Sequence, residues 1–133
     1  MNKSIRAYCG SLLGFLLLDA VWLGLIAKDS YIEAMAGLMR AEVRIWPWII
    51  FYGLYCMAIV YLVIRPNYHA AQGKNVLLGG AVLGAAAYGA YNMTNYALLA
   101  GWPLDISLQD WAWGTVVTSL SSYCGWRLAR TAL

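Results

Sequence analysis

The sequence predicts an all-α membrane protein with four transmembrane helices and a short amphipathic helix at the membrane surface between the first and the second. Of its 133 residues, 62% are hydrophobic and only 11% are charged, against about 45–50% and about 25% in soluble domains. A soluble chain this short has too little interior to hide that apolar excess. The length fits one domain, which we place over residues 1–133.

The few charges leave four apolar runs, each long enough for a membrane helix. About 20 residues, rising 1.5 Å each, cross the roughly 30 Å hydrocarbon core. The predicted spans are residues 5–27, 45–64, 76–100 and 108–127. They are continuously apolar instead of alternating, which favours helices over strands. We interpret the first run as a retained span and not a signal peptide, because Asp19 interrupts it and no small-residue cleavage site follows.

Lysine and arginine predict the orientation. With four spans, the side that holds both termini carries six of them: Lys3, Arg6, Arg65, Lys74, Arg127 and Arg130. The other side carries only Lys28, Arg40 and Arg44. Because cytoplasmic loops of membrane proteins are enriched in these residues, we expect both termini in the cytoplasm.

Residues 29–44, between the first two spans, carry the signals of the short surface helix. Ser30 and Glu33 have the spacing of a capping box, which predicts that the helix begins at Ser30. Apolar residues then recur at helical spacing, at Ile32, Met35, Leu38 and Met39. This helix is either a lid over a site or a connector that follows the membrane surface.

Small and aromatic residues suggest how the bundle packs. Gly80 and Gly84 have the spacing that lets two membrane helices approach closely, either within the chain or in a homo-oligomer. Near the outer interface lie Trp46, Trp48, Trp102 and Trp111, as in an aromatic belt. Four tryptophans exceed what anchoring needs, which suggests that some of them line a site.

Polar side chains from all four spans are predicted to meet at one depth. An ionisable group inside a membrane helix costs about 2.5–3.5 kcal/mol, so each marks a candidate functional site. At 1.5 Å per residue, four polar side chains lie roughly 20–25 Å from the inner ends of their spans: Asp19, Tyr52, Asn92 and Asp110. Each aspartate has a tryptophan three residues later, on the same helix face.

We therefore predict a pocket in the outer half of the bundle. Its candidate ligand-binding residues are Asp19, Trp22, Tyr52, Tyr55, Tyr91, Asn92, Asn95, Asp110 and Trp113. A buried hydrogen-bond network is the alternative, in which Asp19 pairs with Asn95 or a tyrosine hydroxyl and holds the helices in register. The two interpretations are compatible. Asp110 also suits the first turn of a helix, where an acid complements the helix dipole.

Other kinds of site have no support in the sequence. His69 is the only histidine and lies in a predicted loop, while Cys9, Cys56 and Cys124 are scattered without metal-ligand spacing. No phosphate-binding or dinucleotide motif is present. We expect no metal, no cofactor and no nucleic-acid partner.

Five motifs resemble the pattern of a bacterial family of small membrane proteins of unknown function. They are Leu18-Asp19-x-x-Trp22-Leu23-Gly24, Phe51-Tyr52-x-x-Tyr55, Tyr91-x-x-Thr94-Asn95, Gly101-Trp102-Pro103 and Asp110-x-Ala112-Trp113-Gly114-Thr115. The resemblance implies four transmembrane helices and a bacterial inner membrane, but no established activity. The family usually has an acid where this chain has Asn92.

Three functions are compatible with these residues. The first is binding or transport of a small apolar or amphipathic, lipid-like molecule in the pocket. The second is a lipid-modifying enzyme with Asp19 or Asp110 as general acid or base. The third is an accessory subunit whose polar cluster only orders the bundle. Whether the protein is an enzyme stays open, and its expected partners are the lipid bilayer, a small hydrophobic ligand and a second copy through Gly80 and Gly84.

Overall fold

The computed structural model describes residues 2–131, and every regular element in that part is helical. The α-helices are α1 (Lys3–Val21), α2 (Lys28–Met35), α3 (Trp46–Ala58), α4 (Lys74–Leu98) and α5 (Leu104–Arg130). Short turns of other helix types extend two of them, namely the π-helical η1 (Trp22–Ile26) and η2 (Ile59–Ile64) and the 3-10 turn η3 (Arg65–Asn67). The all-helical prediction is therefore confirmed.

Within residues 2–131, three helical stretches are long and apolar enough to cross a membrane: Lys3–Ile26, Trp46–Asn67 and Lys74–Leu98. They agree with the first three predicted spans to within a few residues. α5 has the length, at 27 residues, but it is more polar, and its buried side chains include Ser107, Thr118, Ser121 and Ser122. A helix that its neighbours shield from lipid needs a narrower apolar surface. That α5 also crosses the membrane remains a prediction.

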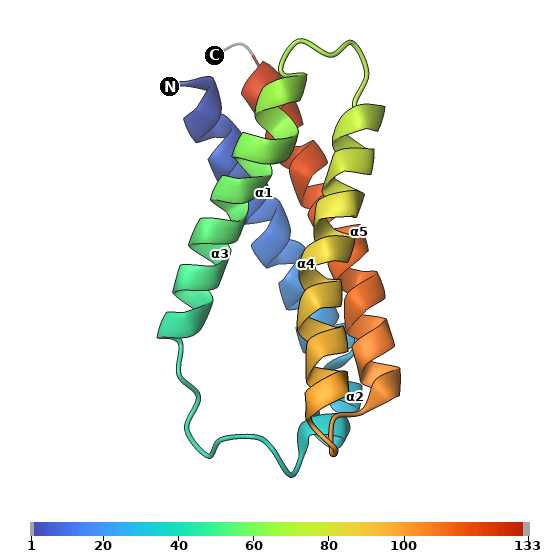
Figure 1. The fold of residues 1–133 in the computed structure, drawn as a ribbon. Coiled ribbons are helices and arrows are strands. Elements are labelled where there is room, and N and C mark those ends of the chain that lie inside the picture. Colours follow the sequence, from blue (N-terminus) through green and yellow to red (C-terminus); the bar gives the residue numbers. More distant parts are fainter. Residues whose placement is uncertain (1, 132–133) are drawn as a thin grey trace.

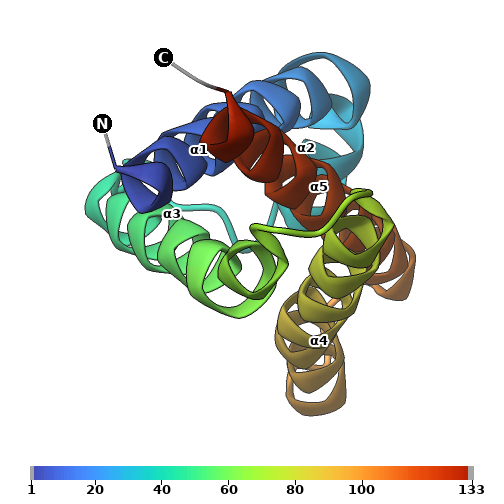
Figure 2. The same cartoon turned by 90° about the horizontal axis from the view of Figure 1, so that it is seen from above.

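α5 is the central element of the bundle. It packs along α1 on one side and along α4 on the other (Figure 2). α3 lies against α1, and its extension η2 also contacts α4 and α5. α3 and α4 are therefore close near the chain termini and diverge toward the opposite end (Figure 1). The start of α1 and the end of α5 lie at the same end of the bundle (Figure 1).

Aromatic rings fill the middle of the bundle. Phe15 of α1 is fully buried and packs edge-on against Tyr52 and Tyr55 of α3, with ring centroids 5.5 and 5.6 Å apart. The Tyr55 hydroxyl also shares a hydrogen bond of 2.8 Å with Oγ1 of Thr118 on α5. These contacts close the core beneath the diverging ends of α3 and α4.

The close approach of α4 to α5 depends on glycines. A Cβ added at Gly80 would lie 2.8 Å from the Cα of Ser119, and one at Gly84 would lie 2.8 Å from the Cβ of Thr118. Both glycines are thus buried within the chain. The surface around Gly80 and Gly84 is not available to a second copy, because α5 already occupies it. This corrects the prediction of a homo-oligomer through these two glycines.

The predicted surface helix exists as α2, but its boundaries differ from the prediction. α2 begins at Lys28 without a side-chain cap, so Ser30 lies inside its first turn and the capping box with Glu33 does not form. The reason is that η1 leads almost directly into α2: the Ala27 N–H donates to the Trp22 carbonyl, and the Ala27 carbonyl accepts from Tyr31. The helix ends at Met35, and an irregular connector follows over residues 36–45.

Candidate functional site

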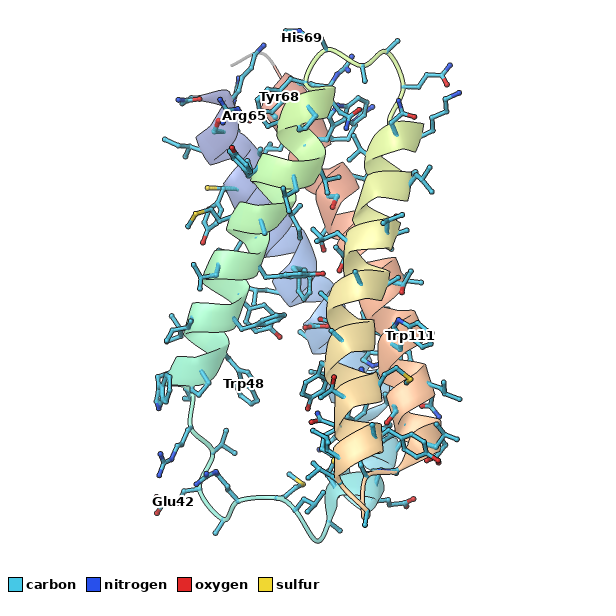
Figure 3. All side chains as sticks on the ribbon, viewed as in Figure 1. Glu42, Trp48, Arg65, Tyr68, His69 and Trp111 are labelled. Carbon is cyan, nitrogen blue, oxygen red and sulfur yellow. The ribbon has the colours of Figure 1, made fainter. Side chains whose placement is uncertain are left out.

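A cavity of about 690 Å³ lies where α3 and α4 diverge. All five α-helices contribute to its wall, and Trp48 of α3 points into the space between α3 and α4 (Figure 3). The wall consists of Asp19, Leu23, Tyr31, Met35, Trp48, Phe51, Tyr52, Ala87, Tyr88, Tyr91, Asn92, Trp102, Ile106, Asp110 and Trp113. Eight of these side chains are aromatic and only Asp19, Asn92 and Asp110 are otherwise polar, so the cavity is apolar with a few hydrogen-bonding groups.

The Asp19 carboxyl group connects three helices on one side of the cavity. One oxygen, Oδ2, accepts a hydrogen bond of 2.7 Å from the Tyr52 hydroxyl of α3. The other, Oδ1, accepts one of 2.8 Å from the indole N–H of Trp113 on α5. Asp19 itself is 8% exposed. A group this buried is tolerated in an apolar bundle because both its oxygens have donors.

Asp110 connects α5 to α2 and α4 in the same manner. Its Oδ1 accepts a hydrogen bond of 2.6 Å from the Tyr31 hydroxyl, and its Oδ2 accepts one of 2.7 Å from Asn92 Nδ2. Asn92 Nδ2 also donates to the Tyr88 carbonyl at 2.9 Å, which fixes the orientation of the amide because a carbonyl can only accept. Burial, together with the hydrogen bond to Asp110, raises the pKa of Tyr31, so this hydroxyl stays protonated and able to donate at neutral pH.

Two stacked indoles join the Asp19 and Asp110 groups into one network. The rings of Trp22 and Trp113 lie 4.6 Å apart between centroids and within 5° of parallel. The Trp113 N–H donates to Asp19, whereas the Trp22 N–H donates to the Tyr31 oxygen at 3.4 Å. Because Tyr31 accepts from Trp22, its own proton points to Asp110. Hydrogen bonds and one ring stack thus connect all the helices around the cavity.

The structure brings most of the predicted pocket residues together. Six of the nine line the cavity, namely Asp19, Tyr52, Tyr91, Asn92, Asp110 and Trp113. Trp22 lies behind Trp113, on which it stacks. Tyr55 instead points into the core toward Thr118, and Asn95, one turn beyond Asn92, is outside the wall. Of the two partners expected for Asp19, a tyrosine hydroxyl is the one that it has.

Several wall residues were not among the predicted ones. Tyr31 and Met35 come from α2, so this helix forms part of the cavity wall. Trp48 and Trp102 come from the end of the bundle opposite the termini, and the surplus of tryptophans was the only sequence signal for them. Tyr88 could have been found from its spacing of four residues to Asn92, which places both on one face of α4.

The long apolar helices define the chain as a helical membrane protein. Over residues 4–127 it matches the family described as "Predicted membrane protein (DUF2177)", and the chain belongs to this family. No curated protein and no solved structure matches it. Among residues 2–131, no three His, Cys, Asp or Glu side chains come close enough together to hold a metal ion.

Proposed function

We propose that this protein binds a small apolar or amphipathic, lipid-like molecule in the cavity between α3 and α4. The cavity is the main observation that supports this proposal. Its volume of about 690 Å³ falls within the range of about 300–1,000 Å³ that is typical of ligand pockets. Its aromatic wall with a few fixed polar groups is also typical of such pockets, whereas packed interiors leave few voids larger than a water molecule.

The position of the cavity favours access from the bilayer. Trp48 and Tyr91, both 55% exposed, lie on the diverging helices α3 and α4, and Phe51 beside them is 40% exposed. Another part of the wall is formed by Tyr31 and Met35 of α2. A molecule dissolved among lipid chains reaches the cavity between α3 and α4 without leaving the apolar phase.

Binding accounts for the carboxyl groups better than acid–base chemistry does. Every oxygen of Asp19 and Asp110 already has a hydrogen-bond donor. Such bonds fix the position of a polar anchor, whereas a general acid or base must exchange its proton with a reacting group. We further propose that the chain crosses a bacterial inner membrane four times with both termini in the cytoplasm, which places the cavity in the outer half of the bundle.

Mass spectrometry of the intact protein, purified in a mild detergent, tests this function. We expect a stoichiometric lipid-like adduct on the unmodified chain. Ala87 lines the cavity, so Ala87→Phe places a ring inside it and should lower the adduct occupancy at least tenfold, while Ala86→Phe, at the exposed neighbouring position, should retain it. Equal occupancy in the two variants, both folded, would place the adduct elsewhere and overturn the proposal.

A further inference from the structure

The cavity has a charge imbalance that a ligand can correct. All four hydrogen bonds to Asp19 and Asp110 come from neutral donors. The nine lysines and arginines of the chain all lie within the described residues, and none of them lines the cavity. Its wall therefore holds two acids and no basic side chain.

The donors leave both oxygens of Asp110, and one oxygen of Asp19, as hydrogen-bond acceptors. The indole N–H of Trp113 can only donate, and so can the Asn92 amide nitrogen, whose orientation the Tyr88 carbonyl fixes. Tyr31 receives the Trp22 N–H, so it donates to Asp110 as well. Both oxygens of Asp110 thus act as acceptors, at 2.6 and 2.7 Å, distances typical of charge-assisted bonds.

We infer that the molecule bound in this cavity carries a positively charged ammonium head group, held by Asp19 and Asp110, on an apolar chain directed toward the opening between α3 and α4. The inference rests on the proposed function and specifies its ligand class. Each carboxylate oxygen has two acceptor sites and uses one within the protein, which leaves acceptor capacity for an ammonium group.

The aromatic wall suits the same ligand. A cation within about 6 Å of an aromatic ring is attracted to the face of that ring, and quaternary ammonium groups are commonly held by several rings together. Tyr88, Tyr91 and Trp102 line the cavity, with Tyr91 and Trp102 edge-to-face at 5.8 Å. An anionic head group would be repelled by a carboxylate, and a neutral one would leave a carboxylate charge uncompensated in an apolar medium.

Three probes with the same chain and different charge test the inference. They are dodecylammonium, 1-dodecanol and dodecanoate, titrated into the full chain in an uncharged maltoside detergent. Saturable changes in tryptophan fluorescence report binding, because Trp48, Trp102 and Trp113 line the cavity. We expect the Kd of the ammonium probe to be at least tenfold lower than that of either other probe.

Variants test whether the preference for the ammonium probe depends on the carboxylates. Asp110→Asn should remove it, while Asp105→Asn, an exposed acid on the same helix outside the wall, should retain it. Should loss of the carboxylate unfold the chain, Tyr91→Lys places a positive charge at a half-exposed wall position. It should weaken ammonium binding at least tenfold, and Tyr96→Lys, also exposed on α4 but outside the wall, should not.

Each other outcome has a distinct meaning. Equal saturable binding of the three probes, abolished by Ala87→Phe, would overturn the charge preference and leave the proposed function intact. An ammonium preference that survives in both Asp110→Asn and Tyr91→Lys would overturn the inference as well. No saturable binding of any probe, combined with no adduct on the purified chain, would overturn the inference and the proposed function together.

Discussion

Tyr31 holds the network together from outside the long helices. Its ring belongs to the short helix α2, yet its hydroxyl donates to Asp110 of α5 and accepts from Trp22 of η1. A hydrogen bond to a charged group contributes more to stability than one between neutral groups. This single hydroxyl therefore fixes α2 over the cavity and supports the carboxylate that we propose as a ligand anchor.

We expect Tyr31→Phe to lower the free energy of unfolding by about 1.5–3 kcal/mol, because it keeps the ring and removes only the hydrogen bond to the carboxylate. Denaturant unfolding in a mild detergent, followed by circular dichroism, measures this loss. Tyr96→Phe is the matched control, since Tyr96 is 46% exposed. If the two variants unfold at the same denaturant concentration, the Tyr31 hydroxyl contributes nothing to stability.

The sequence predicts the depth of these side chains better than their direction. The depth of a side chain along its helix follows from the rise per residue alone. For this reason Asp19, Asn92 and Asp110 are correctly expected at one level. Direction also depends on the tilt and rotation of each helix, which neighbouring helices determine. Tyr55 shares a helix with Tyr52 and lies at a suitable depth, but α3 is rotated so that Tyr55 contacts Thr118 in the core.

The packing of α4 on α5 shapes one wall of the cavity. Gly114 of α5 lies against the ring of Tyr88 on α4, and a Cβ added there would overlap that ring. Tyr88 is itself a wall residue, and its carbonyl orients Asn92. The contact between the two helices and the shape of the cavity are therefore coupled through one glycine.

We expect Gly114→Ala to destabilise the protein by about 1–3 kcal/mol, because overpacking displaces either α5 or the Tyr88 ring. Gly24→Ala is the control. No atom lies within 4 Å of a Cβ at that position, so the change should be neutral or stabilising by up to about 1 kcal/mol. Thermal unfolding of both variants tests this, and an equally stable Gly114→Ala protein would contradict the close contact.

Local signals predict the long helices well and α2 poorly. The long helices follow from long apolar runs with few charges, and such runs leave few alternatives in a membrane. The start of α2 was predicted from Ser30 and Glu33, a pattern that assumes a free chain before the helix. In the structure η1 continues almost directly into α2, so the position of Ala27 after η1 decides the start.

The two ends of the bundle differ in their connections. The loop between η3 and α4, which includes His69, lies at the end that holds both chain termini, and the connector that carries Glu42 lies at the opposite end (Figure 3). If the bundle spans a bilayer, the two connections face opposite compartments. The excess of lysine and arginine predicts which end faces the cytoplasm.

Cysteine labelling in intact cells tests this orientation. In a chain whose three native cysteines are replaced by alanine, we expect Glu42→Cys to react with a membrane-impermeant maleimide from outside. Gln72→Cys, in the opposite connection, should react only after the cells are permeabilised. Both positions are exposed, so burial does not limit the reaction. The reverse pattern would invert the orientation, and labelling of both from one side would contradict the spanning bundle.

The polar character of α5 has a consequence for how the protein is made. Insertion of a helix into a bilayer from the translocon depends on its hydropathy, and α5 is not among the three stretches apolar enough to cross by composition. It also leaves the ribosome after α1 and α4, against which it packs. The order of the chain thus supplies two apolar helices before the polar one, and we expect α5 to enter the membrane together with these partners and not alone.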